Sequence, residues 1–254
     1  MKTLYFDLSM GAAGDMLTAA LLELTEDPEE TLGQLNALGI PGVRFEAEKQ
    51  ERKGVSGTYM RVTVQGEEED GHHHHHHSTL TDIQGILDHL RASAAVKEQA
   101  GAVYERIARA EAEVHGQPVT QVHFHEVGAM DAVADVSAVC FLLEKLGADA
   151  ILASPVHTGY GKVHCAHGIL EVPAPATALL LQGIPREKGD VEGELCTPTG
   201  AALLVHFGQM FGSMPLMRTK TVGYGIGKRE FPAANCVRAF WGEADESDLQ
   251  CGRC

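Results

Sequence analysis

The segment that most limits how this chain can fold is residues 66–78, which read GEEEDGHHHHHHS. It holds four consecutive acidic residues and six consecutive histidines, and it has no apolar side chain for a core. A segment of this composition cannot offset the entropy lost on ordering, so it stays exposed. We therefore expect an exposed, acidic, His-rich loop between an N-terminal α/β part (residues 1–65) and a main α+β part (residues 79–241), with a disordered tail at residues 242–254.

Outside this loop the composition is that of an ordinary globular protein. Hydrophobic residues make up 44% of the 254 residues, and a chain of this length buries enough surface to fold without disulfide bonds. The formal net charge of -15 repels phosphate backbones and anionic membranes, which argues against nucleic acid and membrane partners.

The N-terminal apolar run stops at Asp7, too short for an export signal, and the most apolar stretch, residues 132–153, contains four charged residues. We expect a cytoplasmic chain whose six cysteines are free thiols or metal ligands.

The periodicity of apolar residues predicts strands and helices over most of the chain. Residues 3–7 are a short β-prone run that ends in a glycine turn and leads into a helical pattern from Met16 to Leu24. The other predicted helices are 29–38, 80–92, 95–114, 132–146, 175–182 and 200–211, and the other predicted strands are 43–50, 57–65, 219–226 and 235–241. These elements predict an α+β fold in which mixed sheets pack against helices.

The turn GAAGDM (residues 11–16), between the first strand and the first helix, is the first candidate binding segment. A glycine turn in this position aims backbone N–H groups at a phosphate or carboxylate above the helix N-terminus, and Asp7 at the strand end is placed to hold a cation. Asp7, Gly11, Gly14 and Asp15 are therefore candidate substrate- or phosphate-binding residues. A tight turn with Asp15 as the N-cap explains the same pattern without any ligand.

Imidazoles and carboxylates gather at residues 123–135. His123 and His125 share one face of an extended segment, about 7 Å apart, and Glu126 follows them. Asp131 and Asp135 come shortly after. Such a cluster is typical of a transition-metal site or of bases for proton transfer. We take the two histidines and the glutamate as candidate catalytic residues, and the two aspartates as candidate metal ligands.

A thiol and an imidazole lie close together at residues 164–168, which read HCAHG. Cys165 and His167 alternate onto one face of any strand formed here. They combine a soft donor with a borderline one, which suits nickel, zinc or copper. Both are candidate metal ligands, although a buried cysteine beside a turn histidine explains the pattern equally well.

Two later turns rich in glycine and threonine are candidate anion sites. Residues 196–200 read CTPTG and open a predicted helix, so Thr197, Thr199 and Gly200 are placed either to bind a substrate phosphate or to cap that helix. Residues 223–228 read GYGIGK, which is either a phosphate-binding loop with a lysine or an ordinary hairpin.

The histidine run in the exposed loop is a flexible metal trap, because four acidic residues directly precede it. A disordered run has no fixed geometry, so it would buffer metal rather than catalyse a reaction. Its composition is also that of an inserted purification tag. The candidate metal ligands of this run are His72, His73, His74, His75, His76 and His77.

Five blocks of sequence, in this order, resemble the N-terminal part of the LarC family of nickel-insertion proteins. The resemblance extends from about residue 3 to residue 241, and members of that family commonly have a His-rich stretch in the same place. The blocks are LYFDLSMGAAGDM, VHFHEVGAMDAVADV, HCAHGILEVPAPAT, ELCTPTGAALL and VGYGIGKREFPAANCVRAF.

The resemblance implies an enzyme that inserts nickel into pyridinium-3,5-bisthiocarboxylic acid mononucleotide, consuming CTP with the help of Mg²⁺ or Mn²⁺. The product would be the nickel pincer cofactor of lactate racemase. Making a nickel–carbon bond requires removal of the ring C4 proton, which needs a base beside nickel donors. The implied partners are the pincer-nucleotide precursor, the long or C-terminal LarC product and lactate racemase, and a homo-oligomer is compatible with the sequence.

The chain departs from the family pattern in two ways. We expect a serine in many relatives where Ala13 stands, so the resemblance does not carry a hydroxyl contact over to that turn. Full-length relatives continue into a C-terminal domain associated with CTP, and this chain resembles the short first product of a frameshifted pair. We therefore expect it to bind precursor and nickel without completing CTP-dependent insertion alone.

Two other functions fit parts of the sequence. Nickel storage or delivery would use the histidine run and need no nucleotide. A carboxylate-rich metal hydrolase would use the aspartates but would leave Cys165 and the histidine run without a role.

Overall fold

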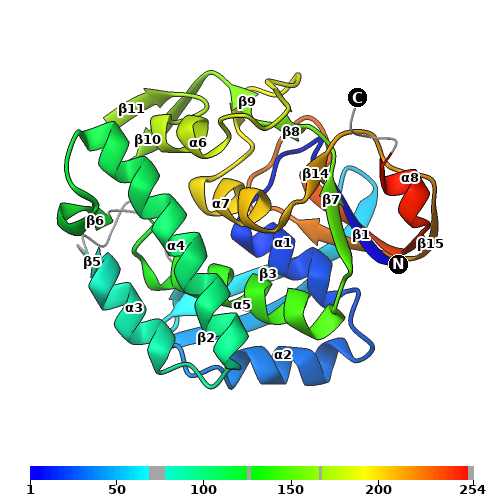
Figure 1. Cartoon of the computed structure of the whole chain (residues 1–254), viewed down its shortest axis with the longest axis horizontal. Coiled ribbons are helices and arrows are strands. Elements are labelled where there is room, and N and C mark those ends of the chain that lie inside the picture. The colour runs from blue at the N-terminus through cyan, green and yellow to red at the C-terminus, as the bar shows by residue number, and fades with distance from the viewer. Residues whose placement is uncertain (69–77, 125–126, 166–167, 251–254) are drawn as a thin grey trace.

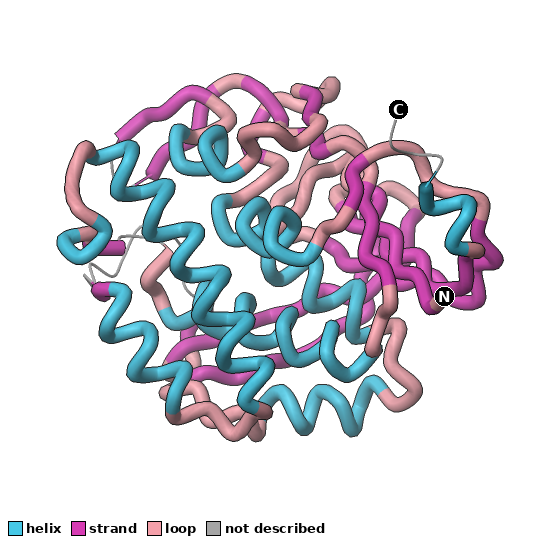
Figure 2. The backbone as a smooth tube through the Cα atoms, in the orientation of Figure 1, coloured by secondary structure: helices cyan, strands magenta, loops and turns pink. Residues whose placement is uncertain are grey.

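The computed structural model describes residues 1–68, 78–124, 127–165 and 168–250. The architecture is α+β, as the sequence predicts, with a large mixed sheet and a set of helices packed against it (Figure 1, Figure 2). Most of the predicted His-rich loop, including the whole histidine run, lies outside the described residues.

One eight-stranded sheet runs through the molecule. Its strands are β1 (Lys2–Asp7), β2 (Val43–Arg52), β3 (Val55–Val64), β4 (Glu67–Glu68), β7 (Ala150–Ala153), β14 (Met210–Phe211), β15 (Met217–Ile226) and β16 (Cys236–Ala244). They are ordered β14-β7-β1-β16-β15-β3-β2, and β4 pairs with β3 beside this path. β1 is parallel to β7 and antiparallel to β16, and β15 is parallel to β3. Strands from residues 1–65 and from the main part therefore share one sheet.

Short strand pairs shape the loops outside this sheet. They are β5 (Ser78–Thr79) with β6 (His123–Phe124), β8 (Val156–His157) with β12 (Arg186–Glu187), β9 (Gly159–Tyr160) with β13 (Gly193–Glu194), and β10 (Lys162–Cys165) with β11 (Gly168–Glu171). The β10–β11 hairpin lies at the top of the molecule in Figure 1, beside α6.

The helices lie against the sheet and against one another. Their bounds are α1 (Gly14–Leu22), α2 (Pro28–Asn36), α3 (Leu80–Asp88), α4 (Ala94–His115), α5 (Met130–Leu146), α6 (Pro175–Leu180), α7 (Pro198–Phe207) and α8 (Glu246–Gln250), with a 3₁₀ turn η1 (Val119–Gln121). α1 is buried almost all round, because it packs on β15 and β3 and is covered by α5 and α7. α4 packs on the outside of α5, α6 and α7 (Figure 1). None of the helices in the described ranges is long and apolar enough to span a membrane.

Two glycines in β15 allow α1 to lie unusually close to the sheet. A Cβ on Gly223 would overlap the carbonyl oxygen of Ala20, and one on Gly225 would overlap that of Met16. Their spacing of two places both on the same face of the strand. Residues 223–226 therefore belong to a strand of a hairpin, and Gly223 and Gly225 serve helix–sheet packing rather than forming a phosphate-binding loop.

Two predicted helices end four residues earlier than the sequence suggests. The helix predicted over 80–92 stops at Asp88. The helix predicted over 200–211 stops at Phe207, and the next residues turn back so that β14 joins the sheet edge parallel to β7. Gly208 permits this turn, since a Cβ there would meet the Leu204 carbonyl oxygen at 2.6 Å.

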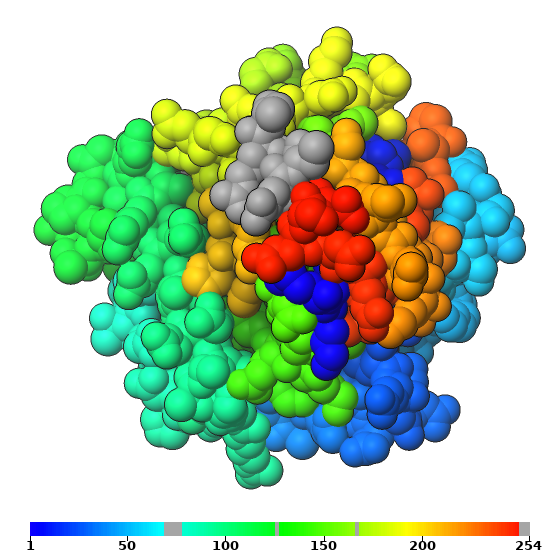
Figure 3. All heavy atoms as spheres, turned by 45° about the vertical axis from the view of Figure 1, so that its right-hand side comes forward, coloured from blue at the N-terminus to red at the C-terminus, as the bar shows by residue number. Residues whose placement is uncertain are grey.

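The segment predicted as a disordered tail from residue 242 begins with ordered structure. β16 continues through Ala244, and its end is tied to the N-terminus by two hydrogen bonds. The Met1 amino group donates to the Ala244 carbonyl over 3.0 Å, and the Ala244 N–H donates back to the Met1 carbonyl over 3.2 Å. α8 then follows, and Figure 3 shows these last residues, in red, beside the blue N-terminus.

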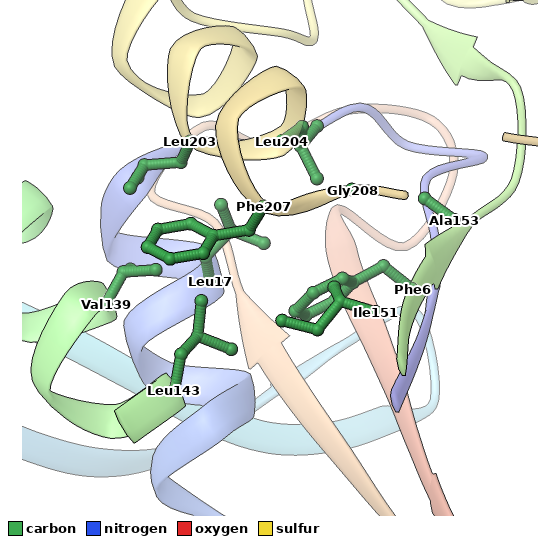
Figure 4. A pocket seen from close by; sticks show the side chains of 10 residues that line it. All are labelled: Phe6, Leu17, Val139, Leu143, Ile151, Ala153, Leu203, Leu204, Phe207 and Gly208. Atoms are coloured by element: carbon green, nitrogen blue, oxygen red, sulfur yellow. The ribbon is translucent and has the colours of Figure 1, made fainter. Parts of the chain in front are cut away.

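A small apolar cavity lies where α1, α5 and α7 meet β1 and β7 (Figure 4). Its volume of about 10 Å³ is barely enough for one water molecule, and its lining offers that water no polar side chain. The cavity is therefore a packing void. Its lining residues are Phe6, Leu17, Val139, Leu143, Ile151, Ala153, Leu203, Leu204, Phe207 and Gly208.

Candidate functional site

The glycine turn at residues 11–16 is shaped by two close contacts with distant parts of the chain. Gly11 has a φ of 71°, and a Cβ there would overlap the backbone carbonyl of Leu195. A Cβ on Gly14 would stand 2.5 Å from the Cβ of Asp135. Both glycines are therefore required by packing, and through Gly14 the N-terminus of α1 lies directly against α5.

Asp15 is the second residue of α1, and the N-cap position belongs to Ala13 instead. The Met16 N–H donates a hydrogen bond of 2.7 Å to Oδ1 of Asp15. Burial raises the pKa of Asp15 to about 6, against the opposing effect of this hydrogen bond. An acid that titrates near neutral pH therefore stands at the start of α1.

Asp135 faces α1 from the second turn of α5. Its Oδ1 atom is buried and accepts no hydrogen bond within the described part of the chain. Burial, and then the charges of Asp15 and Asp131, raise the pKa of Asp135 well above its ordinary value. Because two adjacent carboxylates in a poorly solvated site oppose each other's ionisation, this pair holds a proton more readily than an isolated aspartate does.

Asp131 completes a group that we call the carboxylate cluster, made of Asp15, Asp131 and Asp135. Asp131 is the second residue of α5, as Asp15 is of α1, and its Oδ1 accepts a hydrogen bond of 2.6 Å from the Ala132 N–H. Burial and then the charges of the two α5 aspartates raise the pKa of the Tyr104 hydroxyl. The N-termini of α1 and α5 therefore converge on one acidic site above a buried tyrosine.

A second polar group borders the cluster beside Asp15. The hydroxyl of Tyr59 donates a hydrogen bond of 2.5 Å to Oε1 of Glu68, and the Lys228 ammonium group lies 3.4 Å from the same oxygen. Arg61 approaches the other oxygen of Glu68 at 3.7 Å. The charge of Lys228 lowers the pKa of Asp15 and that of Glu68 raises it, although both effects are smaller than burial. The acidic cluster therefore has a basic group at its border.

The threonine turn at the start of α7 lies against the glycine turn. The Thr197 N–H donates a hydrogen bond of 3.0 Å to the Ala12 carbonyl, and a Cβ on Gly200 would overlap that same oxygen. The Thr197 hydroxyl caps α7 by accepting a hydrogen bond of 3.2 Å from the Gly200 N–H, and it lies 3.1 Å from the Thr199 hydroxyl. The capping interpretation is thus confirmed for Thr197, and two candidate anion turns are neighbours.

The carboxylate of Asp7 is bound by other residues of this chain. Arg238 on the neighbouring strand β16 forms an ion pair with Oδ2 of Asp7, and the Ser9 N–H donates a hydrogen bond of 2.9 Å to Oδ1. Burial opposes ionisation, but these two partners outweigh it and keep the pKa of Asp7 below its ordinary value. The cation placed against Asp7 is therefore a guanidinium group of this chain.

The histidine segment after η1 is described only in part. His123 is exposed on β6, where it pairs with Thr79 of β5, and its charge contributes to the lowered pKa of Asp82 after the hydrogen bonds from Thr79. His125 and Glu126 lie outside the described residues. The catalytic roles predicted for these three residues therefore stay predictions.

The predicted soft metal donors are likewise described in part. Cys165 is partly exposed on β10, opposite Gly168 of β11. His167 and the run His72–His77 lie outside the described residues. Where the structure does describe side chains, it shows no group of three or more His, Cys, Asp or Glu residues arranged to hold a metal ion. A nickel site that includes these histidines stays a prediction.

Two features of the site could not be predicted from the sequence. The contact between Asp15 and Asp135 joins residues far apart in the chain, and Glu68 and Tyr59 carry no motif. One feature of the sequence could have indicated this site. α1 and α5 begin alike, with an alanine N-cap and an aspartate at the second helical position. Two helices with the same polar start suggest a shared site at their N-termini.

The sequence of this chain is similar to one protein family and to several named relatives. The family described as nickel insertion protein matches residues 4–251. A relative from Dictyoglomus thermophilum, whose name assigns it to nickel insertion, is 40% identical over 98% of this chain and 63% of its own length. Two relatives are named pyridinium-3,5-bisthiocarboxylic acid mononucleotide nickel insertion protein. The one from Desulfitobacterium hafniense is 39% identical over 98% of this chain and 60% of its own length, and the one from Staphylococcus epidermidis is 38% identical over 97% and 61%.

This chain therefore spans about three-fifths of the length of these relatives. No solved structure gives a significant match to it. The family match extends over all the segments that build the carboxylate cluster and its border. With this match over nearly its whole length, the chain belongs to the nickel insertion protein family, the LarC family that its five sequence blocks resemble.

Proposed function

We propose that this chain acts in the insertion of nickel into pyridinium-3,5-bisthiocarboxylic acid mononucleotide, yielding the nickel pincer cofactor of lactate racemase. The names of the relatives from D. hafniense and S. epidermidis support this substrate. The structural observation that carries the proposal is the convergence of the α1 and α5 N-termini on the carboxylate cluster. In this proposal the chain is a nickel-inserting enzyme of the lyase class, and nickel is its substrate.

Formation of a nickel–carbon bond requires a base beside the ring. The bond between ring C4 and its hydrogen breaks as the bond to nickel forms, and the proton passes to a protein group. A carboxylate with a pKa of about 6, such as that of Asp15, accepts a proton readily near neutral pH. Asp15 therefore joins His123, His125 and Glu126 as a candidate base.

The proposal also includes CTP with Mg²⁺ or Mn²⁺, as the family resemblance implies. Asp131 and Asp135 offer the carboxylate oxygens that such ions prefer, and these ions are commonly held by one or two carboxylates together with phosphates of the nucleotide. Thr197 and Thr199 place hydroxyl groups at the N-terminus of α7, where an anion is favoured. A metal ion held by Asp131 and Asp135 would neutralise part of the negative charge on the phosphates of CTP.

An insertion assay tests the proposed function. The purified chain is incubated with the mononucleotide substrate, Ni²⁺, CTP and Mg²⁺, in one arm alone and in another with the portion of a longer relative that it does not span. Mass spectrometry detects the nickel-containing product. We expect product when that portion is supplied and substrate binding without turnover when it is not. Absence of product in both arms would contradict the proposal.

Replacement of His123 by alanine is expected to reduce nickel insertion at least about 100-fold, if this residue transfers a proton or holds nickel during the reaction. Its side chain is exposed, so the melting temperature should stay nearly unchanged. The matched control is His89→Ala, which removes another exposed histidine at the end of α3. Full activity of His123→Ala would show that the residue has no chemical role, and unfolding of the variant would show that the residue is needed for the fold.

Nickel storage or delivery is a second candidate function, and the composition of residues 67–77 favours it. Deletion of residues 72–77 is expected to lower the number of nickel ions bound per chain, because six imidazoles are lost, while the melting temperature stays the same. Isothermal titration calorimetry with Ni²⁺ measures the stoichiometry. An unchanged stoichiometry would rule out storage by this segment, and retained insertion activity would show that the segment is dispensable for the chemistry.

A further inference from the structure

We propose that Lys228 binds the phosphate group of the mononucleotide substrate. This inference rests on the proposed function, because that function supplies the substrate. A pyridinium mononucleotide joins a ring with a fixed positive charge to a phosphate that is anionic at neutral pH. The two ends of the molecule therefore need surroundings of opposite charge.

The carboxylate cluster attracts the positively charged ring of the substrate and repels its phosphate. Asp15, Asp131 and Asp135 attract a cationic ring, and the net charge of -15 makes the chain as a whole repel anions. A local cation that faces the phosphate would offset this repulsion. Lys228 meets that need, because its ammonium group lies 3.4 Å from Glu68 at the border of the cluster and its charge lowers the pKa of Asp15.

The contacts of Glu68 do not depend on Lys228 alone. Lys228 lies 3.4 Å from Oε1 of Glu68, whereas the Tyr59 hydroxyl donates to the same oxygen at 2.5 Å. Arg61 faces the other oxygen at 3.7 Å. Glu68 therefore keeps two partners when Lys228 moves to a phosphate. The Lys228 side chain is 46% exposed, so a ligand can reach it.

The backbone that carries Lys228 is fixed relative to α1. Gly225, three residues earlier, packs directly on the Met16 carbonyl in the first turns of α1. The Gly227 N–H donates a hydrogen bond of 2.9 Å to the Asn235 carbonyl, and the Asn235 side chain donates one of 2.8 Å to the Arg229 carbonyl. The lysine is thus held beside the cluster before any ligand binds, which lowers the cost of recognition.

The test compares two ligands that differ only in the phosphate, nicotinate mononucleotide and nicotinate riboside. Isothermal titration calorimetry measures the dissociation constant of each for the wild-type chain and for Lys228→Ala, Lys228→Arg and Lys220→Ala. Lys220 is the matched control, since it is an exposed lysine on β15 that pairs with Glu243. We expect Lys228→Ala to weaken mononucleotide binding about tenfold or more and to leave riboside binding unchanged. Lys228→Arg should restore most of the affinity, and Lys220→Ala should bind like the wild type.

A merely structural role for Lys228 predicts another pattern. Loss of the lysine would then disturb Glu68 and Asp15 and weaken both ligands equally. Equal weakening, or an unchanged preference for the mononucleotide in Lys228→Ala, would overturn the proposal. The insertion assay separates this failure from that of the proposed function, because a wild-type chain that supports insertion while Lys228→Ala keeps its phosphate preference contradicts only the role of Lys228.

Discussion

Replacement of Asp15 by asparagine is expected to stabilise the folded chain near neutral pH and to lower the rate of nickel insertion at least about 100-fold. The stabilisation follows from the pKa of about 6, which shows that the folded protein disfavours the ionised carboxylate. Asparagine keeps the shape and the acceptor for the Met16 N–H but cannot take a proton. A substitution that raises stability but lowers activity identifies a residue that serves function rather than folding.

The stabilisation should depend on pH in a defined way. Below about pH 4 the carboxyl group is protonated in both the folded and unfolded chain, so wild type and Asp15→Asn should be equally stable. Between that pH and about 6 the unfolded chain ionises first, and the wild type loses stability as the pH rises. Above that range the difference should level off, on the order of 1–2 kcal/mol after allowance for solvent screening.

Thermal and urea unfolding across this pH range measure the effect. Asp135→Asn should show the same sign, since the pKa of Asp135 is raised by burial and by Asp15. The matched control is Asp190→Asn, at an exposed aspartate outside the cluster, which should change neither stability nor activity. A loss of stability at neutral pH in both cluster variants would contradict the description of this pair.

Replacement of Gly225 by alanine is expected to destabilise the fold by about 3 kcal/mol or more. A Cβ at this position overlaps the Met16 carbonyl and stands 2.8 Å from the Ala20 backbone nitrogen, and neither backbone group can yield easily. α1 would have to move away from β15, and Asp15 would move with it. Urea unfolding measures the loss, and reduced mononucleotide binding in the folded fraction would accompany it.

The matched control for this substitution is Gly33→Ala. Gly33 lies within α2, where a Cβ would meet no described atom within 4 Å. Alanine favours a helix over glycine, so this variant should gain about 0.5–1 kcal/mol. Equal effects of the two substitutions would show that close packing of α1 on β15 is not needed.

Local structure followed well from local sequence. The strand and the helix at the N-terminus, the cap by Thr197 and the start of α6 at Pro175 depend on residues close together in the chain. Their backbone conformations are decided within a few residues. A sequence alone is sufficient to predict such features.

Features that depend on tertiary contacts could not be predicted in this way. The same glycine spacing at residues 223–228 fits a phosphate loop or a strand, and only the presence of α1 above it decides for the strand. The helix predicted to continue to residue 211 gives way to β14 because the sheet edge at β7 offers backbone partners. Asp15 and Asp135 meet only because Gly14 lets two helices touch. Local pattern carries no information about that contact.

A crystal structure of this chain with the pyridinium mononucleotide bound tests most directly whether the carboxylate cluster is the site of nickel insertion. We expect the ring to lie beside Asp15 and Asp135 and the phosphate to lie within hydrogen-bond distance of the Lys228 ammonium group. A mononucleotide bound elsewhere, such as in the groove between α4 and α6 that Arg106 and Arg109 line, would contradict the assignment of the carboxylate cluster as the site of nickel insertion.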